Sequence, residues 1–502
     1  MYRIIKPKKI IKSIIYLLLI FFIIQYLFDI NISNYNGTYS IDINATIHAL
    51  QQAKSREIDV ENKYQLTAII LHWKRLSGTR RLIQYYLNTN LFKQIIIWNN
   101  NPEITLTIDQ LLVNSTSVNL IHIINFHENL KDEAKYRACA RAQTPACFYA
   151  DDEWNTSGYI KSLVSSFQSD PNVLHSATSV STYYNNMLWT FMDSQIDLHT
   201  GFSWNTFGSI FLREHAIRHL HLLQMHFPNQ QKLFAVSDLF FPIWLNDIPS
   251  QMIVNLRMLP TSPNETGNSF LPEKESDDLQ QTSTILAIRK LEYSLRLNQS
   301  NTNIDFPRYQ HRQFPYYVKS SSLNDDFIFY TNILPIDIEH ISFSIEKDAE
   351  RATYRNIPSG SDYTHFIGHN TLQAIDGNED TCWHPNKRIR SGDFFAIDFL
   401  RIQSNILVTF VLQHTKKLQN KLDMRLSFDG ISWISYRSRK GILTSTGGTT
   451  SGGSHRLIID SRQFPSELQS FRYISFNATY DFDEVFQVCD VKIIKSSIVI
   501  IK

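Results

Sequence analysis

The sequence predicts an α/β domain with a largely parallel sheet, followed by an all-β sandwich. Strand and helix signals alternate over the first half of the chain, and a stretch rich in Pro, Ser and Asn then interrupts them. Short strands separated by turn residues occupy the remainder. With 502 residues and 43% hydrophobic content, the chain is long enough to bury more than one core.

The N-terminus carries a membrane signal, because basic residues precede an apolar run from Ile14 to Phe28. This pattern predicts a cytosolic tail at 1–12, a single transmembrane signal anchor at 13–29 and a luminal stem at 30–62. A cleaved signal peptide is the alternative, but no small-residue cleavage site follows Phe28. The short span suits the thinner membranes of the early secretory pathway.

The composition fits an oxidising lumen. Asn-x-Ser/Thr triplets recur along the chain, as glycosylation acceptors in a secreted protein would. Four cysteines are present, for which Cys139 with Cys147 and Cys382 with Cys489 are plausible pairs, and free buried thiols are the alternative. A formal net charge of only +2 gives no argument for a nucleic-acid partner.

The segment from 63 to 260 alternates between the two kinds of element. The apolar runs predict strands at Leu66–Leu71, Lys93–Trp98, Asn119–Ile124 and Cys147–Ala150. The helical spacing predicts helices at Arg80–Leu87, Ile108–Val113 and Lys131–Ala142. In a parallel sheet of this type, ligands bind beyond the carboxyl ends of the strands.

Three acidic residues, Asp151-Asp152-Glu153, directly follow the fourth predicted strand. Carboxylates are costly to bury unpaired, so at a strand end they need a cation, a cluster of donors or water. Hard oxygen ligands at this spacing suit Mg²⁺ or Mn²⁺, which can in turn hold a diphosphate. The alternative is a polar turn that caps the next helix.

The mixture of Pro, Ser, Asn and charged residues in 261–339 predicts a linker of loops, with one amphipathic helix at Thr282–Leu297. From 340 to 502 the pattern predicts a β-sandwich or jelly roll with turns at Asp429-Gly430 and in the Gly-rich run after Gly447. The predicted strands are Phe394–Phe399, Ile406–Gln413, Leu422–Phe428, Trp433–Tyr436, His455–Asp460 and Phe471–Phe476.

An ordered set of motifs between Tyr64 and Leu259 resembles the exostosin-like glycosyltransferases, which have a GT-A fold. The motifs are Leu71-His72-Trp73-Lys74-Arg75, Ile95-Ile96-Ile97-Trp98-Asn99-Asn100-Asn101, Lys135-Tyr136-Arg137, Asp151-Asp152-Glu153, Phe207-Gly208-Ser209-Ile210-Phe211 and Val236-Ser237-Asp238-Leu239. The resemblance covers under half of the chain, and it implies a nucleotide-diphospho-sugar transferase.

The resemblance also implies roles for individual residues. Asp151 and Glu153 would hold Mn²⁺ (or Mg²⁺), which stabilises the departing diphosphate. The substrate-binding residues would be Arg75 and Arg137 at the diphosphate, Asn99 or Asn100 at the uracil ring, and Asp151 and Asp152 at the donor. The chain departs from the family in two places: the family's third acid is Asp where Glu153 stands, and Glu133-Ala134 replaces a stretch that contains Asn.

Asp238 stands where the family has an acidic residue near the acceptor hydroxyl or the anomeric carbon. The resemblance implies that it orients the acceptor or stabilises positive charge, in a reaction that retains anomeric configuration. The alternative is a helix cap, because Ser237-Asp238 precedes a helix-like run, Leu239–Leu245.

The C-terminal segment resembles a discoidin or galactose-binding-like β-sandwich. Carbohydrate binding would suit that fold, and a structural domain packed on the enzyme is the alternative. The motifs are Ala374-Ile375-Asp376-Gly377-Asn378-Glu379-Asp380-Thr381-Cys382-Trp383, Gly392-Asp393-Phe394-Phe395-Ala396-Ile397-Asp398-Phe399 and Ser427-Phe428-Asp429-Gly430-Ile431-Ser432-Trp433.

One further pair, His215 and His219, has the four-residue spacing of metal ligands on a helix. No glutamate follows His215 as a metalloprotease helix requires, so we interpret the pair as part of a polar helix face.

We therefore expect a type II membrane glycosyltransferase of the Golgi or endoplasmic reticulum, with its catalytic part in the lumen. It would transfer a sugar, with N-acetylhexosamine as the candidate, from a UDP-sugar to a glycan or glycoprotein acceptor. The alternative is a membrane-anchored lectin or adhesion protein that has lost activity and binds glycans through the sandwich.

Overall fold

The computed structural model describes residues 65–113, 115–228, 230–259, 273–297, 316–336, 361–414, 421–435, 454–464, 468–483 and 486–495. All of these residues belong to one compact unit, Ala53–Lys502. The predicted tail, anchor and stem at 1–62 lie outside the described residues. None of the helices in the described stretches is long and apolar enough to cross a bilayer.

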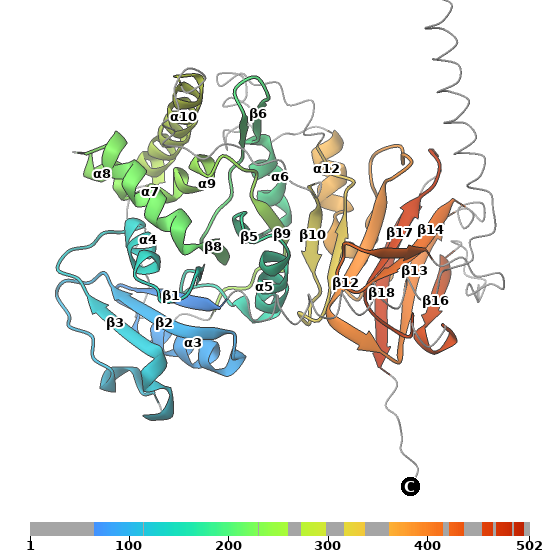
Figure 1. Cartoon of the computed structure of the whole chain (residues 1–502), viewed down its shortest axis with the longest axis horizontal. Helices are drawn as coiled ribbons and strands as arrows, with labels where there is room; N and C mark the ends of the chain where they lie inside the picture. The colour runs from blue at the N-terminus through green and yellow to red at the C-terminus, as the bar shows by residue number, and fades with distance from the viewer. Residues whose placement is uncertain are drawn as a thin grey trace, which may run out of the picture. The chain divides into compact units, whose positions relative to one another are not determined.

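The predicted parallel sheet is present in the first half of the chain (Figure 1). Its first three strands run β3-β2-β1 from the edge inward, and β4 lies parallel to β1 on the other side. β8 is antiparallel to β4 and β5, and β9 is parallel to β5. The bounds are β1 Leu66–His72, β2 Phe92–Asn99, β3 Ile121–Asn125, β4 Ala146–Tyr149, β5 His175–Thr178, β8 Ser209–Leu212 and β9 Ser250–Ile253.

Helices cover both faces of this sheet, which explains why its strands are continuous apolar runs. In β2, Ile95 and Ile97 belong to one core and Ile96 and Trp98 to another, because successive side chains point to opposite faces. Helices α3 (Leu76–Thr89) and α5 (Ile160–Ser169) contribute to the first core, and α4 (Glu133–Ala140) and α7 (Arg213–His226) to the second.

The helix predicted at Ile108–Val113 is only a short 3₁₀ turn, Asp109–Leu111. Leu112 follows it with a left-handed backbone, φ 56°, which ends the turn. A second 3₁₀ segment, Ser115–Leu120, occupies the start of the predicted third strand, so β3 begins two residues later than the apolar pattern indicates.

The amphipathic stretch before residue 298 is helical, and α10 (Glu273–Leu297) is longer than predicted. Its apolar residues join a separate core with Trp244, whose indole N–H donates to the carbonyl of Ala287 at 3.1 Å. The remaining helices and the hairpin strands are α6 Val180–Leu188, α8 Gln231–Phe234, α9 Phe241–Trp244, α12 Ser361–Gly368, β6 Phe191–Asp193 and β7 Leu198–Thr200.

The prediction of loops is wrong for the described residues 316–336 of the linker. β10 (Val318–Ser321) pairs in parallel with β9, and β11 (Ile328–Thr331) pairs with β10 and then with the first strand of the sandwich. The composition did not indicate these strands, although β10 and β11 pair with each other; their outer partners, β9 and β12, are distant in sequence. One sheet therefore continues from the α/β part into the sandwich.

The predicted β-sandwich is confirmed between Ser361 and Lys495 (orange to red in Figure 1). A sheet in the order β15-β14-β17-β12 and a second sheet, β16-β13-β18, contribute to one apolar core. β18 is the one of these strands that the sequence pattern did not indicate. The bounds are β12 Phe394–Ser404, β13 Ile406–His414, β14 Leu422–Ser427, β15 Trp433–Ser435, β16 Ser454–Asp460, β17 Ser470–Ala478 and β18 Phe486–Lys495.

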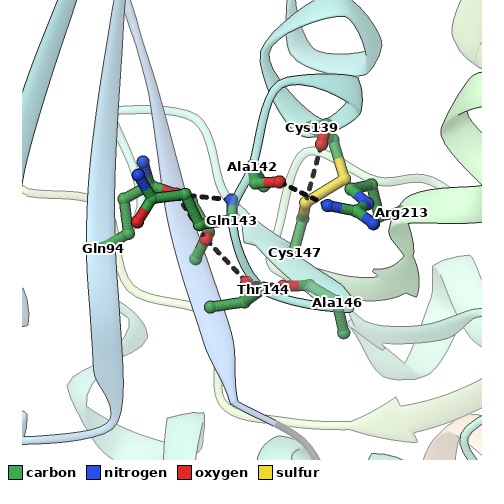
Figure 2. Close-up of a disulfide and its surroundings, with 9 residues drawn as sticks. Gln94, Cys139, Ala142, Gln143, Thr144, Ala146, Cys147 and Arg213 are labelled. Carbon is green, nitrogen blue, oxygen red and sulfur yellow. Dashed lines mark hydrogen bonds between the residues drawn. A yellow bond between two sulfur atoms is a disulfide. The ribbon is translucent and has the colours of Figure 1, made fainter.

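Both plausible cysteine pairs are disulfides, Cys139–Cys147 and Cys382–Cys489. Figure 2 shows the first, which joins the last turn of α4 to β4. Next to it, Arg213 donates to the carbonyl of Ala142 at 2.7 Å. The disulfide therefore fixes the helix that follows β3 against the strand that leads to the acidic triplet.

Replacing both Cys139 and Cys147 by serine should lower the free energy of unfolding by roughly 2.5 kcal/mol, because the short closed loop no longer restricts the unfolded chain. Urea unfolding followed by tryptophan fluorescence measures the change. The wild type under reducing conditions is the control, and an unchanged midpoint in the variant would contradict the assignment of a stabilising disulfide.

Candidate active site at the carboxyl edge of the parallel sheet

The carboxyl ends of β1, β2 and β4 meet at one edge of the sheet because these strands are parallel. The chain passes from β1 outward to β2 and β3 and then returns to place β4 on the opposite side of β1. This reversal is a topological switch point, where open α/β sheets form a crevice for ligands. Arg75 follows β1 and Asp151-Asp152-Glu153 follow β4, so both flank the switch point.

The backbone of the acidic triplet is held by several segments. The amide of Asp151 donates to the carbonyl of Thr206 at 2.9 Å, and the carbonyl of Glu153 accepts from the amide of Leu259 at 2.7 Å. The hydroxyl of Tyr149 donates to the Asp151 carboxylate. Burial raises the pKa of Asp151, although the charge of Lys135 opposes the shift. The triplet lies in a turn, in which the amide of Trp154 donates to the carbonyl of Asp151 at 3.1 Å, but Asn155 and not the triplet caps the next short helix.

The guanidinium of Arg75 forms salt bridges with the other two carboxylates of the triplet, those of Asp152 and Glu153. Its Nη2 lies 2.5 Å from Oδ1 of Asp152 and 2.9 Å from Oε1 of Glu153. Burial raises the pKa of Asp152 to about 6, with Arg75 opposing the rise. Glu153 is the most accessible member of this group, with 37% of its side chain exposed, against 13% for Asp152.

Gly78, in the first turn of α3, makes room for this arrangement. A Cβ at this position would lie 3.2 Å from Oδ2 of Asp152. No sequence motif identified Gly78, since its role depends on a residue from a distant strand.

The two predicted uracil contacts have other partners. The Asn99 amide donates to Ile104 and to Asn125, and its oxygen accepts from the backbone of Asn101. Both Asn99 and Asn100 are buried, and the Asn100 side chain bonds to the backbone of residues 130 and 131. These amides therefore fix the loops that follow β2 and β3, and the contact of either amide with a base stays a prediction.

Arg137, predicted at the diphosphate, lies on α4 and pairs with Glu133 at 2.6 Å. Its guanidinium is 6.0 Å from the ring centroid of Phe126. These contacts place Arg137 beside β3, and the structure does not bring it to the triplet. We call the carboxyl ends of β1 and β4, with the triplet Asp151-Asp152-Glu153, the acidic edge. Arg75 contacts the carboxylates of this edge.

Asp238 lies in a buried hydrogen-bond network instead of capping a helix. Its Oδ2 accepts from Nζ of Lys135 at 2.6 Å, and its Oδ1 accepts from the hydroxyl of Tyr136 at 2.8 Å. That hydroxyl also accepts from the Asn205 amide at 3.0 Å. Both donors to Asp238 come from α4, so the cap interpretation is replaced by a contact across the fold.

Lys135 is the residue at this edge whose importance the sequence analysis missed. It is fully buried, its Nζ lies 4.1 Å from the ring centroid of Tyr149, and Asp132 is 3.9 Å away. The spacing carried a signal: Lys135, Ala138 and Cys139 fall on one helix face, so a lysine stands on the apolar side.

Carboxylates outnumber cations around the edge. Arg75 and Lys135 pair directly with them, and Lys131 acts on Asp132 through its charge. Burial and, second, the charge of Asp238 raise the pKa of Asp132 to about 8, although 35% of its side chain is exposed. The carboxylates concerned are Asp132, Asp151, Asp152, Glu153 and Asp238.

In the described stretches, no group of three or more His, Cys, Asp or Glu side chains is arranged to hold a metal ion. Mg²⁺ is usually bound by one or two carboxylates together with substrate phosphates, so a cage made only of protein ligands is not required. The oxygen chemistry of Asp151 and Glu153 fits a hard divalent cation, provided that Arg75 releases Glu153.

His215 and His219 do not form the predicted polar helix face, since both are buried. The ring of His219 packs against Tyr136, Phe241 and Trp244. Burial lowers the pKa of each histidine to about 3, so both are neutral core residues.

No family model and no curated protein matches the chain. Among solved structures, the chain is similar to CpGH89CBM32-6 from Clostridium perfringens, with 19% identity, 24% of this chain and 81% of that chain covered, and a TM-score of 0.16. It is also similar to the family 32 CBM of C. perfringens NanJ in complex with galactose. The identity is 11%, the match covers 25% of this chain and 85% of that chain, and the TM-score is 0.18.

A third similarity is to a mutant of arabinofuranosyltransferase AftD from Mycobacteria, with 18% identity, a TM-score of 0.17, and 25% of this chain but 9% of that chain covered. These TM-scores are too low to support an assignment. The β-sandwich assignment rests on the pairing and core of its own strands.

The two buried histidines should make the protein less stable in acid. The unfolded chain takes up protons near pH 6.5 and the folded one only near 3, so the free energy of unfolding should fall as pH falls below 6.5. The slope is at most about 1.4 kcal/mol per pH unit for each histidine. Urea unfolding of a His219→Phe variant between pH 7.5 and 5 should show a shallower slope than the wild type.

The matched control is His127→Phe, because the His127 side chain is 81% exposed and its loss should leave the slope unchanged. Equal slopes for the His219 variant and the wild type would show that His219 is not held neutral in the folded protein.

Proposed function

We propose that the chain is a glycosyltransferase that binds a UDP-sugar with Mn²⁺ or Mg²⁺ at the carboxyl edge of β1 and β4. The observation that carries the proposal is the meeting of Arg75 with Asp152 and Glu153 at the topological switch point. The same edge includes the buried pair of Lys135 and Asp238. In a metal-dependent transfer of a sugar, a cation held by carboxylates stabilises the diphosphate, and we assign this role to Asp151 and Glu153, the phosphate contact to Arg75 and the carboxylate near the reacting carbon to Asp238.

The charge balance supports a divalent cation. Two like charges 4 Å apart repel by about 4 kcal/mol at an effective dielectric of 20. A diphosphate could therefore not approach this acidic edge alone. A divalent cation bound with it would offset the excess of carboxylates, and it would supply Lewis-acid stabilisation of the leaving group.

Each residue has a proposed part in this arrangement. Asp151 and Glu153 would hold the cation, with Glu153 accessible and Asp151 fixed by Tyr149. Arg75 would turn from Glu153 to the phosphate oxygens, which guanidinium binds well. Asp152 would stay against α3 beside Gly78 and shape the donor site.

The finer parts of the proposal rest on the family resemblance and on the N-terminal sequence. They are the N-acetylhexosamine donor, retention of anomeric configuration, a glycan or glycoprotein acceptor, and a type II anchor in the Golgi or endoplasmic reticulum.

Asp151→Asn and Glu153→Gln should each weaken Mn²⁺-dependent binding of UDP by more than about tenfold, because each removes one charged ligand of the cation. Isothermal titration of the luminal part with UDP, in the presence and absence of Mn²⁺, measures the change. Asp483→Asn is the matched control, because that carboxylate is 77% exposed in the sandwich. Wild-type protein that does not bind UDP with either metal would contradict the proposal.

Glycan binding by the β-sandwich is the second candidate function, and the resemblance of the C-terminal motifs to a galactose-binding-like sandwich favours it. The chain is similar to carbohydrate-binding modules in complex with galactose and with GalNAc-β-1,3-galactose, and these sugars are the ligands to test first. The pairing of Glu153 with Arg75 is also what an inactive site would retain.

One experiment distinguishes glycan binding by the sandwich from binding at the α/β edge. A galactose- and GalNAc-containing glycan array probed with the luminal part should give the same binding for the wild type and for Asp151→Asn if the sandwich binds glycans. Binding that disappears with Asp151→Asn would locate the glycan at the α/β edge instead. Absence of binding to every glycan would contradict the second function.

A further inference from the structure

The salt bridges of Arg75 involve a carboxylate that the proposed cation needs. We propose that Arg75 competes with the cation for Glu153 and that a diphosphate ends this competition, so that the site binds Mn²⁺ and UDP together and binds Mn²⁺ alone poorly. This inference rests on the proposed transfer function and specifies how cation binding at that site is regulated.

The guanidinium of Arg75 bridges two carboxylates of the triplet. Its Nη2 donates to Oδ1 of Asp152 at 2.5 Å and to Oε1 of Glu153 at 2.9 Å. The Glu153 side chain is 37% exposed, against 13% for Asp152, so a cation from solvent reaches Glu153 more easily. Because Mg²⁺ lies only about 2 Å from its oxygen ligands, a cation on Glu153 would lie next to the guanidinium.

The backbone of Arg75 is fixed, so releasing Glu153 requires only a turn of the Arg75 side chain. Arg75 directly precedes α3, and its carbonyl accepts from the amide and from the hydroxyl of Thr79, both at 3.1 Å. The Thr79 hydroxyl in turn lies 2.9 Å from Nδ1 of His72, the last residue of β1. The guanidinium can therefore change its partner while the surrounding fold stays in place.

Mn²⁺ that binds without an anion has to separate Arg75 from Glu153. The guanidinium then keeps Asp152 as its partner, and its positive charge repels the cation beside it. Breaking an ion pair that is shielded from water is unfavourable when one partner finds no replacement. Arg75 thus lowers the affinity of the site for Mn²⁺ alone.

A diphosphate removes both obstacles. A guanidinium has several N–H donors, so Arg75 can keep Asp152 while it donates charge-assisted hydrogen bonds to phosphate oxygens. The negative charge of the phosphate also lies between two cations, which replaces their repulsion by two attractions. By linkage, UDP raises the affinity for Mn²⁺ by the same factor by which Mn²⁺ raises the affinity for UDP.

The decisive measurement is the binding of Mn²⁺ alone to the full chain, followed by the electron paramagnetic resonance signal of free Mn²⁺. Arg75→Gln removes the guanidinium and should bind Mn²⁺ at least about tenfold more tightly than the wild type. UDP binding in excess Mn²⁺, measured by isothermal titration, should become at least about tenfold weaker, because the phosphate loses its charged donor. A residue that only contacts phosphate would change the second affinity and not the first.

Two control variants separate this competition from a general effect of charge. Arg388→Gln breaks an arginine–carboxylate pair of 3.1 Å in the sandwich and should leave both affinities unchanged. Lys131→Gln removes a positive charge that acts on Asp132. It should raise the affinity for Mn²⁺ by less than about threefold, because the guanidinium stays on Glu153. An equal gain in Lys131→Gln and Arg75→Gln would contradict the inference.

A double variant keeps the inference falsifiable if Arg75→Gln folds poorly. Arg75→Gln with Asp152→Asn removes the guanidinium together with the more buried of its partners, so no carboxylate is left buried without its cation at that position. The net charge of the site is also unchanged. The double variant should still bind Mn²⁺ alone at least about threefold more tightly than the wild type, because Glu153 is released.

The outcomes distinguish the two levels of the proposal. If the wild type does not bind UDP with either metal, the proposed function fails and the inference fails with it. If the wild type binds UDP with Mn²⁺, but Arg75→Gln and the double variant bind Mn²⁺ alone no more tightly than the wild type does, only the inference fails.

Discussion

The parallel pairing of β4 with β1 is the constraint on which the acidic edge depends. It puts the end of β4, and with it the acidic triplet, next to the end of β1, from which Arg75 reaches across. The Cys139–Cys147 disulfide then fixes α4 to the same strand. Lys135 on α4 is thereby directed to Asp238, which comes from a distant part of the chain. One strand placement thus assembles side chains from four segments.

The edge holds more negative charge than a stable fold needs. Buried carboxylates destabilise a protein unless they are paired, and Arg75 and Lys135 pair with only some of those present. Burial raises the pKa of Asp132, Asp151 and Asp152, so protons can offset part of the excess. Groups with shifted pKa values cluster at functional sites, where burial and neighbouring charges are arranged to shift them.

The sequence predicted features that depend on local pattern. Strands β1 to β4, the sandwich strands other than β18 and the position of the triplet followed from apolar runs and turn residues, and both plausible cysteine pairs are disulfides. Strands β5, β8 and β9 and the contacts between distant segments were not predicted. β10 and β11 pair with each other and are flanked by the distant strands β9 and β12, and the Asn99 amide donates to Asn125 at the end of β3 as well as to Ile104. Lys135 belongs to one of the motifs of the family resemblance, but only the tertiary structure shows that its side chain is buried.

Binding of a divalent cation together with a diphosphate at the edge between β1 and β4 can be tested by anomalous X-ray diffraction from crystals grown with Mn²⁺ and UDP. We expect one manganese peak about 2.0–2.2 Å from carboxylate oxygens of Asp151 or Glu153 and from diphosphate oxygens, with Arg75 turned away from Glu153. UDP bound elsewhere, or a manganese peak remote from both carboxylates, would contradict it.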